Sequence, residues 1–566
     1  MRFGLKFSSP HWHPVCESVG MAAKPKTPFT IVRGGKLLDI AKRKAAPADI
    51  LIKGDTIAEI GRPGLAAPAG ATVVDARHRL MHPGLINAHT HGPGNLGKGM
   101  GDLWSLELLL TASPWINGGR TLEDKYLSSL IGGCEMVMKG CTAAYDLAAE
   151  FPLPSVDGLS AMARAYEDVG MRAVLAPMVA DITFFDAIPG LMDRLSPSLQ
   201  KEVESFRYSP WKATTRQMKK ALQKWPFETV MLAVAPTIPH HCSDDFLVAC
   251  RNLAREYDVG VHSHVAESKV QVVAGYGRYG TSLAAHMDEL GLVNERFTVA
   301  HGVWLDDEDM KRLGDRGASV AHNPGSNMRL GNGLADVRGM LNRKVNVGVG
   351  TDGANCSDNQ NMYEAMRLAS LSSKVQGPDV QSWLTTEETL RAATEGSARA
   401  LGLEKQIGRI APGYKADIVF LDLHHINWIP TNDPVNALVH TEDGTAVHSV
   451  MVGGRMIVED HKLLTVDLAA LPPRPRSHVC GGRRSRRRRR SSTSGWRRSS
   501  ARSVPVWPRR RCISTGFAPV TTLTERAAPG PPLQVRARRS RPRRASRPAS
   551  ADGAAAGNFC IFCIFC

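Results

Sequence analysis

Eight short apolar runs alternate with longer stretches of helical periodicity between residues 81 and 405, and this alternation limits the fold more than any other feature. The runs lie at residues 85–91, 141–147, 172–180, 230–237, 259–267, 296–304, 318–324 and 345–352. Chains that alternate strands with helices form parallel sheets, and eight repeats favour a closed barrel over an open, doubly wound sheet. The predicted fold class is therefore α/β, with a (β/α)8 TIM barrel over residues 81–404.

Polar side chains follow four of the eight predicted strands. They are His89 and His91 after the first strand, His264 and Glu267 after the fifth, His301 after the sixth, and Asp352 after the eighth. Taken singly, a strand histidine is more often a hydrogen-bonded core residue, and an aspartate after Gly-Thr is more often a turn residue. Taken together, they lie at the barrel end where active sites of this fold gather. The pattern predicts one shared site.

The spacing His-x-His occurs three times, so spacing alone does not identify a ligand pair. Residues i and i+2 of a strand share a face, which lets two imidazoles converge on one ion. The pair His11 and His13 lies between Pro10 and Pro14, where a strand is not expected. The other two pairs, residues 89–91 and 262–264, lie on predicted strands and stay open as candidates.

The net charge of +17 comes from one end of the chain. Residues 471–566 contain 23 arginines, no lysine and two acidic residues, whereas the first 470 residues carry 48 basic and 52 acidic groups. Nucleic-acid binding is therefore not expected of the folded body. No apolar run reaches the length of about 18 residues that a membrane span needs, and residues 1–20 lack the apolar centre of a signal peptide. A cytoplasmic protein is expected, with no membrane partner.

Both ends of the chain are expected to lie outside the fold. Residues 1–26 are an N-terminal extension, and Met21 reads as a natural beginning of the folded part. The Arg-rich, low-complexity tail over 471–566 is predicted to be disordered. Its composition fits a frameshift near Leu471, and a basic arm that binds nucleic acid is the alternative. The six cysteines before the tail form no CxxC motif, which argues against a disulfide framework and a cysteine zinc site.

Five motifs in order, "PGLINAHTH", "HSHVAES", "VAHGVWL", "AHNPGSN" and "VGVGTDG", resemble the metal-dependent amidohydrolase superfamily. Within it, the chain is most similar to the cytosine/guanine deaminase-like branch, which includes methylthioadenosine/S-adenosylhomocysteine deaminases and triazine hydrolases. The resemblance covers about residues 27–465. It implies a distorted barrel with a small β-sandwich domain built from both chain ends, here residues 27–80 and 405–470. We also expect a homo-oligomer.

The resemblance implies that His89, His91, His264 and Asp352 bind one divalent metal ion. Three imidazoles and a carboxylate suit Zn²⁺, and Fe²⁺ is the alternative. His264 stands three residues before Glu267, as the family's HxxE pattern requires, and His262 is the alternative ligand. The fourth strand has no lysine to bridge a second metal, so a mononuclear site is expected.

The resemblance also assigns catalytic roles. Glu267 moves a proton from a metal-bound water to a ring nitrogen, His301 steers the resulting hydroxide, and Asp352 carries a proton to the leaving group. The expected reaction is hydrolytic deamination of an aminated N-heterocycle of the purine, pterin or triazine type. The alternatives are release of chloride or an alkylamine from a similar ring, and an inactive scaffold that acts as an assembly protein.

Two departures from the family's nucleoside deaminases concern the substrate. Those enzymes have Pro-His at the end of the fourth strand, where this chain has Pro236-Thr237, and the loop after His91 is richer in glycine. Both features favour free bases or small heterocycles over nucleosides. Trp104 and Trp304 are candidates for stacking on a planar ring, with plain packing as the other interpretation.

Overall fold

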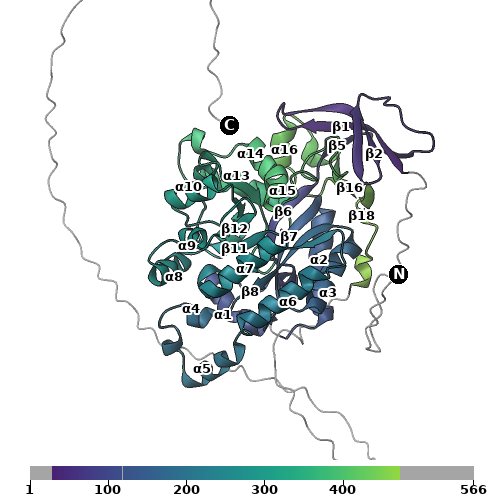
Figure 1. Cartoon of the computed structure of the whole chain (residues 1–566). Helices are drawn as coiled ribbons and strands as arrows, with labels where there is room; N and C mark the ends of the chain where they lie inside the picture. The colour runs from purple at the N-terminus through teal and green to yellow at the C-terminus, as the bar shows by residue number, and fades with distance from the viewer. Residues whose placement is uncertain (1–27, 118, 472–566) are drawn as a thin grey trace, which may run out of the picture. The chain divides into compact units, whose positions relative to one another are not determined.

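A computed structural model describes residues 28–117 and 119–471 of the chain (Figure 1). The predicted N-terminal extension, the His11-Trp12-His13 segment and the Arg-rich tail beyond Leu471 lie outside these residues. The expectations about them are therefore not tested by the fold.

All eight predicted barrel strands are present. They are β6 (Leu85–Thr90), β7 (Cys141–Ala149), β8 (Arg172–Val179), β9 (Val230–Leu232) with β10 (Ala235–Pro236), β11 (Val261–Val265), β12 (Phe297–His301), β13 (Ser319–His322) and β14 (Asn346–Val349). The predicted fourth strand is split into β9 and β10, because between them Val234 forms a bridge to Val261 of β11. The other seven strands start and end within three residues of their expected bounds.

The strands close into a distorted barrel. Parallel pairing gives one sheet in the order β10-β8-β7-β6, with β9 beside β8, and a second in the order β11-β12-β13-β14. The Val234–Val261 bridge joins the sheets on one side. On the other side, the amide of Asp352 donates to the carbonyl oxygen of His89 at 2.9 Å. The α/β barrel predicted from the sequence is confirmed.

Helices surround these strands. They are α1 (Leu106–Asn117), α2 (Leu122–Met138), α3 (Val156–Val169), α4 (Phe184–Ala187), α5 (Pro197–Val203), α6 (Trp211–Gln223), α7 (Asp244–Glu256), α8 (Lys269–Tyr279), α9 (Leu283–Glu289), α10 (Asp307–Asp315), α11 (Pro324–Arg329), α12 (Val337–Asn342), α13 (Met362–Lys374), α14 (Thr386–Arg391), α15 (Ser397–Ala400) and α16 (Pro434–His440). Several begin at a hydroxyl cap: Thr121 and Asp124 form a capping box on α2, and Ser243 caps α7. Helix α2 lies against β7, and α3 against β8.

A third sheet, outside the barrel, is made from both ends of the described chain (Figure 1). Its strands are β1 (Phe29–Asp39), β2 (Lys44–Lys53), β3 (Thr56–Gly61), β4 (Thr72–Asp75), β5 (Arg79–Pro83), β15 (Ile418–Asp422), β16 (Val447–Val452), β17 (Arg455–Glu459) and β18 (Lys462–Leu463). The order is β18-β17-β16-β15-β5-β1-β2-β3, with β4 beside β1. The N-terminal and C-terminal parts meet where β5 pairs with β15.

Apolar side chains of both parts share one core. Val32 and Ile50 from the N-terminal strands pack with Phe420 and Met451 from the C-terminal strands. The sheet extends three residues past the expected boundary at residue 80, because Met81 pairs with Phe420 and is fully buried in this core. Burial of shared apolar surface therefore couples the two chain ends to each other and to the start of the barrel.

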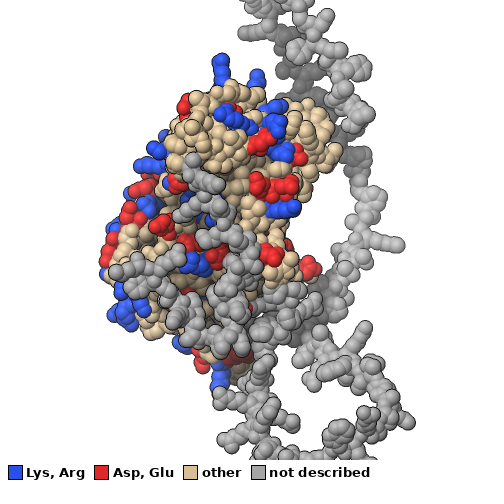
Figure 2. Space-filling model, turned by 90° about the vertical axis from the view of Figure 1, so that its right-hand side faces the viewer, with Lys and Arg blue, Asp and Glu red and all other residues tan. Residues whose placement is uncertain are grey.

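The surface of the described residues carries mixed charge. On the face in Figure 2, lysine and arginine side chains are interspersed with aspartate and glutamate. The five cysteines in this part of the chain are buried free thiols, namely Cys134, Cys141, Cys242, Cys250 and Cys356. Among the described residues, we find no helix with the length and apolarity needed to cross a bilayer.

Candidate functional site

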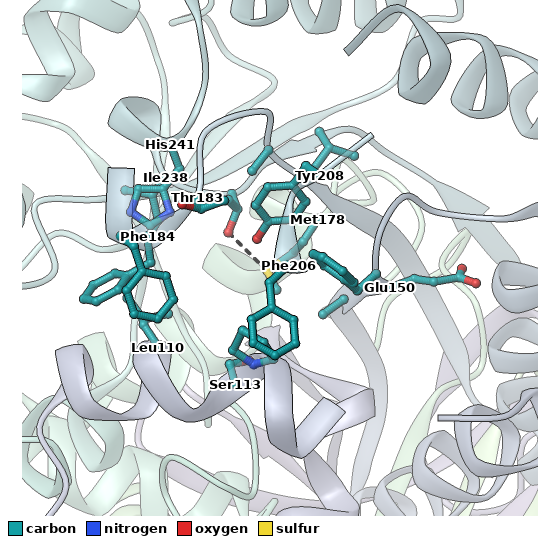
Figure 3. Close-up of a pocket in the computed structure, with 17 residues that line it drawn as sticks. Leu110, Ser113, Glu150, Met178, Thr183, Phe184, Phe206, Tyr208, Ile238 and His241 are labelled. Atoms are coloured by element: carbon teal, nitrogen blue, oxygen red, sulfur yellow. Dashed lines mark hydrogen bonds between the residues drawn. The ribbon is translucent and has the colours of Figure 1, made fainter. Parts of the chain in front are cut away.

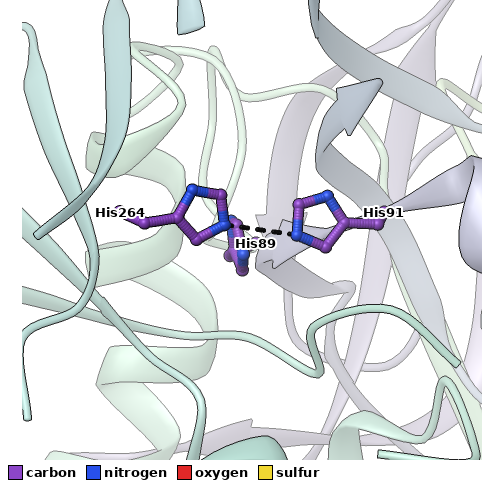
Figure 4. Close-up of side chains that lie close together, drawn as sticks. All are labelled: His89, His91 and His264. Atoms are coloured by element: carbon purple, nitrogen blue, oxygen red, sulfur yellow. Dashed lines mark hydrogen bonds between the residues drawn. The ribbon is translucent and has the colours of Figure 1, made fainter. Parts of the chain in front are cut away.

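Three of the predicted ligands lie together at the carboxyl ends of β6 and β11. The ring centroid of His89 lies 4.8 Å from that of His91 and 5.0 Å from that of His264. The centroids of the His91 and His264 rings are 5.3 Å apart (Figure 4). The Nε2 atoms of His91 and His264 are separated by 3.3 Å. Three imidazoles from two distant segments therefore face one point.

The carboxylate of Asp352 completes this cluster. Its Oδ1 atom lies 3.3 Å from Nε2 of His91 and 3.6 Å from Nε2 of His89. Burial alone raises the pKa of Asp352, but the surrounding imidazoles, led by His91, hold it below its ordinary value. The carboxylate is thus an anion at the centre of a group of nitrogen atoms.

Backbone carbonyl groups fix the orientation of two of the imidazoles. Nδ1 of His91 donates to the carbonyl oxygen of Leu147 at 2.7 Å, and Nδ1 of His264 donates to that of Thr237 at 2.7 Å. With the proton on Nδ1, the lone pair of each Nε2 faces the cluster. Burial, followed by the charges of His91 and His301, lowers the pKa of His264 to about 3, which keeps its ring neutral.

The donor atoms suit a divalent transition metal. Ligand atoms of His89, His91 and His264 lie within 4.8 Å of one another, and so do those of His89, His301 and Asp352. Both ring nitrogens of His89 are buried and have no hydrogen-bond partner among the described residues. A buried polar atom without a partner is costly, and a metal–nitrogen bond removes that cost. The residues therefore fit the ion that the sequence predicted.

The alternative ligand, His262, occupies a deeper position in the barrel. Its ring centroid lies 5.0 Å from that of His89 and 4.4 Å from that of Tyr145. Two of the three groups of ligand atoms around the cluster include His264, and none of them includes His262. Among the described residues, neither nitrogen of His262 has a hydrogen-bond partner.

Glu267 lies at the edge of the cluster and is 2% exposed. Burial, together with the charge of Asp352, raises its pKa well above the ordinary value. The side-chain amide of Asn332 donates to Oε1 at 3.1 Å, and that of Gln271 donates to Oε2 at 3.4 Å. A held carboxyl group with a raised pKa is suited to accept and return a proton near neutral pH.

His301 lies beside both carboxyl groups. Its Nε2 atom is 3.6 Å from Oε1 of Glu267 and 3.8 Å from Oδ2 of Asp352. Its Nδ1 atom lies 2.9 Å from the amide oxygen of Asn327, which accepts the Nδ1 proton. Burial lowers the pKa of His301, so the ring is neutral with a free lone pair on Nε2.

The backbone turns sharply at three points around the cluster. Ala266, His301 and Asp352 have φ values of 53°, 71° and 61°. Residues other than glycine rarely adopt this left-handed conformation, which has an energetic cost. Each turn directs the chain away from its strand at the barrel mouth, where the side chains of Glu267, His301 and Asp352 meet.

Five of the six predicted residues line a small cavity with a volume of about 90 Å³. They are His91, His264, Glu267, His301 and Asp352, whereas His89 is fully buried and does not line it. We refer to it as the metal cavity. Leu106, Leu109, Leu110 and Met178 supply an apolar wall. The space is suited to a small planar group held against the polar cluster.

Several contacts of the site were not anticipated from the sequence. Ser326 donates to Oδ2 of Asp352 at 2.6 Å, and the supporting amides of Asn327, Asn332 and Gln271 were likewise missed. Asn327 belongs to the quoted "AHNPGSN" motif, which was the available signal. Neither Trp104 nor Trp304 lines the metal cavity.

The two tryptophans have structural contacts instead. The indole nitrogen of Trp304 donates to the carbonyl oxygen of Asn332 at 2.8 Å, and Lys269 lies over its ring. Trp104 packs against a small apolar cluster that includes Leu106 and Leu330. These contacts are of the kind that the packing interpretation describes, and stacking on a substrate ring stays an untested alternative.

Comparison with known proteins agrees with the geometry. Residues 80–457 match the model of the amidohydrolase family. The chain belongs to this family. It is 33% identical over 438 residues to a 5-methylthioadenosine/S-adenosylhomocysteine deaminase of Pyrococcus abyssi, covering 77% of this chain and 95% of that one. It is 31% identical to a 5'-deoxyadenosine deaminase of Methanosphaera stadtmanae, covering 76% and 93%.

Solved structures give the same result. An adenosine deaminase from Xanthomonas campestris with bound zinc has a TM-score of 0.69 and 26% identity, over 79% of this chain and 97% of that chain. An atrazine chlorohydrolase from Arthrobacter aurescens in complex with zinc has a TM-score of 0.69 and 25% identity, over 78% and 100%. This family member is therefore an enzyme of hydrolytic chemistry, and zinc is bound in related structures.

Proposed function

We propose that the protein deaminates an aminated N-heterocycle by metal-dependent hydrolysis, with His89, His91, His264 and Asp352 as ligands of one Zn²⁺ ion. The observation that carries the proposal is the convergence of these four side chains with Glu267 and His301 at one end of the barrel. The deaminases among the relatives support the same reaction class. Fe²⁺ remains the alternative metal, since such a donor set accepts either ion.

The chain's own groups suit the proton transfers. When bound, a divalent ion supplies a water of lowered pKa at neutral pH. Glu267 is placed to take up a proton and deliver it to a ring nitrogen, because its raised pKa allows both protonation states. Protonation of that nitrogen makes the adjacent ring carbon open to attack.

His301 and Asp352 complete the arrangement. The free lone pair on Nε2 of His301 accepts a hydrogen bond from the attacking water and orients it toward the ring. Asp352, held by Ser326 and by the amide of Gly353, is placed to pass a second proton to the departing amine. The products are ammonia and the oxo form of the heterocycle.

A screen for ammonia release tests the reaction. The zinc-loaded protein is offered guanine, 8-oxoguanine, cytosine, adenosine, methylthioadenosine, S-adenosylhomocysteine, isoxanthopterin and aminotriazines. We expect turnover of at least one, with free bases or small heterocycles ahead of nucleosides, because Thr237 stands where nucleoside deaminases of this branch have histidine. A nucleoside as the best substrate would reverse that order but leave the reaction class intact.

Hydrolysis of another leaving group is the second candidate. The likeness to an atrazine chlorohydrolase favours it, because the same residues can activate a ring that bears chloride. Chloride and alkylamine release are therefore measured beside ammonia. Their release without ammonia would establish this second reaction. No turnover of any ring by the metal-loaded protein would contradict the proposed function.

A further inference from the structure

A second cavity adjoins the metal cavity. It has a volume of about 130 Å³, and its distinctive lining consists of the aromatic side chains of Phe151, Phe184, Phe185, Phe206 and Tyr208. We refer to it as the aromatic chamber. Figure 3 shows Phe184 beneath Ile238 and His241, with Phe206 between Tyr208 and Ser113. Three separate segments supply these rings: the loop just after β7, the short helix α4, and the stretch before α6.

The chamber and the metal cavity share a wall. Both spaces are lined by Leu110, Ser113, Ala149, Met178, Thr237 and Ile238. Thr237 also accepts the Nδ1 proton of His264 through its carbonyl oxygen, so the shared wall touches a predicted metal ligand directly. A ligand whose ring occupies the metal cavity can thus extend a substituent into the chamber.

The chamber has no unpaired charge to offer a ligand. None of the residues that line it, within the described part of the chain, is lysine or arginine. Its carboxylate, Glu150, is held by Lys125 at 2.5 Å and by the hydroxyl of Ser155 at 2.7 Å, and Figure 3 shows it pointing away from the rings. Burial lowers the pKa of His241 well below its ordinary value, so this ring is neutral.

The Thr237 hydroxyl in the shared wall and the His241 carbonyl in the chamber lining both have partners within the protein. The hydroxyl of Thr237 donates to Sδ of Met178 at 3.6 Å, the dashed contact in Figure 3. The carbonyl oxygen of His241 accepts from the amides of Asp181 and Ile182 at 3.2 and 3.0 Å. Burial of a charged group here would lack compensation, whereas an apolar group would replace water against aromatic faces.

Resting on the function proposed above, we propose that the substrate carries an uncharged apolar substituent, a small ring or short alkyl chain, that binds in the aromatic chamber. An engineered apolar cavity of about 150 Å³ holds a benzene molecule, so a space of this size suits one small ring. The same reasoning excludes a substituent that ends in a carboxylate or an amino acid group. Phe206 and Tyr208 are then residues that determine specificity.

Binding of three substituted adenines tests the chamber. Adenosine-type purines carry their substituent on N9, so the probes are 9-methyladenine, 9-benzyladenine and 9-carboxymethyladenine, titrated calorimetrically into the full-length, zinc-loaded protein. We expect 9-benzyladenine to bind about 10-fold or more tightly than 9-methyladenine, because its ring is removed from water. The carboxymethyl compound should bind no more tightly than the methyl compound.

Variants locate the effect. Phe206→Ala should reduce the benzyl preference to less than about 3-fold, since it removes one aromatic wall. Phe227→Ala is the matched control: this half-buried phenylalanine lies in another surface cavity, and its loss should leave the preference unchanged. If Phe206→Ala does not fold, Tyr208→Ala replaces it.

The outcomes separate the two proposals. Equal affinity for the benzyl and methyl compounds, tighter binding of the carboxymethyl compound, or a benzyl preference that survives loss of Phe206 or Tyr208 would overturn the chamber as a subsite. Ammonia release is measured on a separate panel of rings. A benzyl preference without ammonia from any ring would retain the chamber as a subsite and contradict deamination. Ammonia release without a benzyl preference would support deamination and overturn the chamber as a subsite.

Discussion

The metal cavity and the aromatic chamber share a wall, but they are built differently. The polar side chains of the metal cavity come from strand ends, and backbone carbonyls or buried amides hold them. The rings of the chamber come from loops and short segments, including α4, which has four residues. If both proposals hold, the strand ends of the barrel carry the chemistry and the connections between strands determine substrate choice, a division that this fold permits.

The metal cavity and the aromatic chamber also differ in the energetic cost of losing a side chain. Removing a group from the metal cavity leaves buried polar atoms without partners, so one substitution is expected to abolish binding or turnover. Removing a ring from the chamber only enlarges an apolar space, which changes preference by a modest factor. Substitutions in the two cavities should therefore differ in size and in kind.

The largest effect is expected for His89→Ala. This change removes one of four predicted ligands, so metal content should fall from about one ion per chain to below about 0.1. Elemental analysis of the purified protein measures it, with circular dichroism as the check on folding. The control is His262→Ala, which removes a buried histidine on the same barrel interior and should leave the metal in place.

The metal content of these variants can also contradict the proposed ligand set. Full metal content in His89→Ala would remove the proposed site. Loss of metal in a folded His262→Ala protein, with retention in His264→Ala, would show that the deeper histidine is the ligand.

Glu267→Gln comes next. The amide keeps the shape of the side chain but does not cycle a proton, so kcat should fall by about 100-fold or more while metal content is unchanged. Glu256→Gln is the matched control: Glu256 is an exposed carboxylate on α7 that pairs with Lys219 at 2.7 Å and does not line the metal cavity. Its kcat should stay within about 3-fold of the wild type. Normal turnover in Glu267→Gln would assign the proton transfer elsewhere.

A smaller effect is expected for Asn332→Ala. Its amide donates to Oε1 of Glu267 at 3.1 Å, and without it the carboxyl group loses one of its two side-chain donors. We expect kcat to fall by about 10-fold with little change in metal content. Asn252→Ala, an exposed position on α7, is the control and should have no effect. If kcat were unchanged in Asn332→Ala, Gln271 alone would suffice to orient Glu267.

The strand-end residues were predictable because their signal is local. An apolar run followed by His89 and His91, or by Asp352, fixes both the strand and the end at which the side chain lies. The supporting contacts were not, because they join residues far apart: Asn332 reaches Glu267 across 65 positions. No periodicity in the sequence encodes such a pair.

The chamber and the fourth strand also depend on contacts between distant segments, which the sequence pattern does not predict. Phe151, Phe184 and Phe206 lie in segments without strand or long-helix periodicity, so their meeting depends on how three connections fold back on the barrel. The apolar run at 230–237 predicted one strand, but Val234 pairs with Val261 and divides it. Composition indicated a strand there, and tertiary pairing decided its bounds.

The last effect concerns stability rather than activity, at the wall beside the chamber. Burial, and then the charge of Arg278, lowers the pKa of His240 to about 4, whereas in the unfolded chain it is about 6.5. Between these two values the unfolded state binds more protons than the folded state, so the free energy of unfolding falls as the pH falls from 6.5 toward 4. Replacing this histidine by a residue that does not titrate should remove that part of the pH dependence, on the order of 1–3 kcal/mol.

Denaturant unfolding of the wild type and His240→Gln at pH 7.0 and 4.5 measures the difference. The control is His424→Gln, which replaces an exposed histidine. An equal loss of stability in wild type and His240→Gln would show that His240 does not supply it, and would leave the other buried histidines, those of the metal cavity included, as its source.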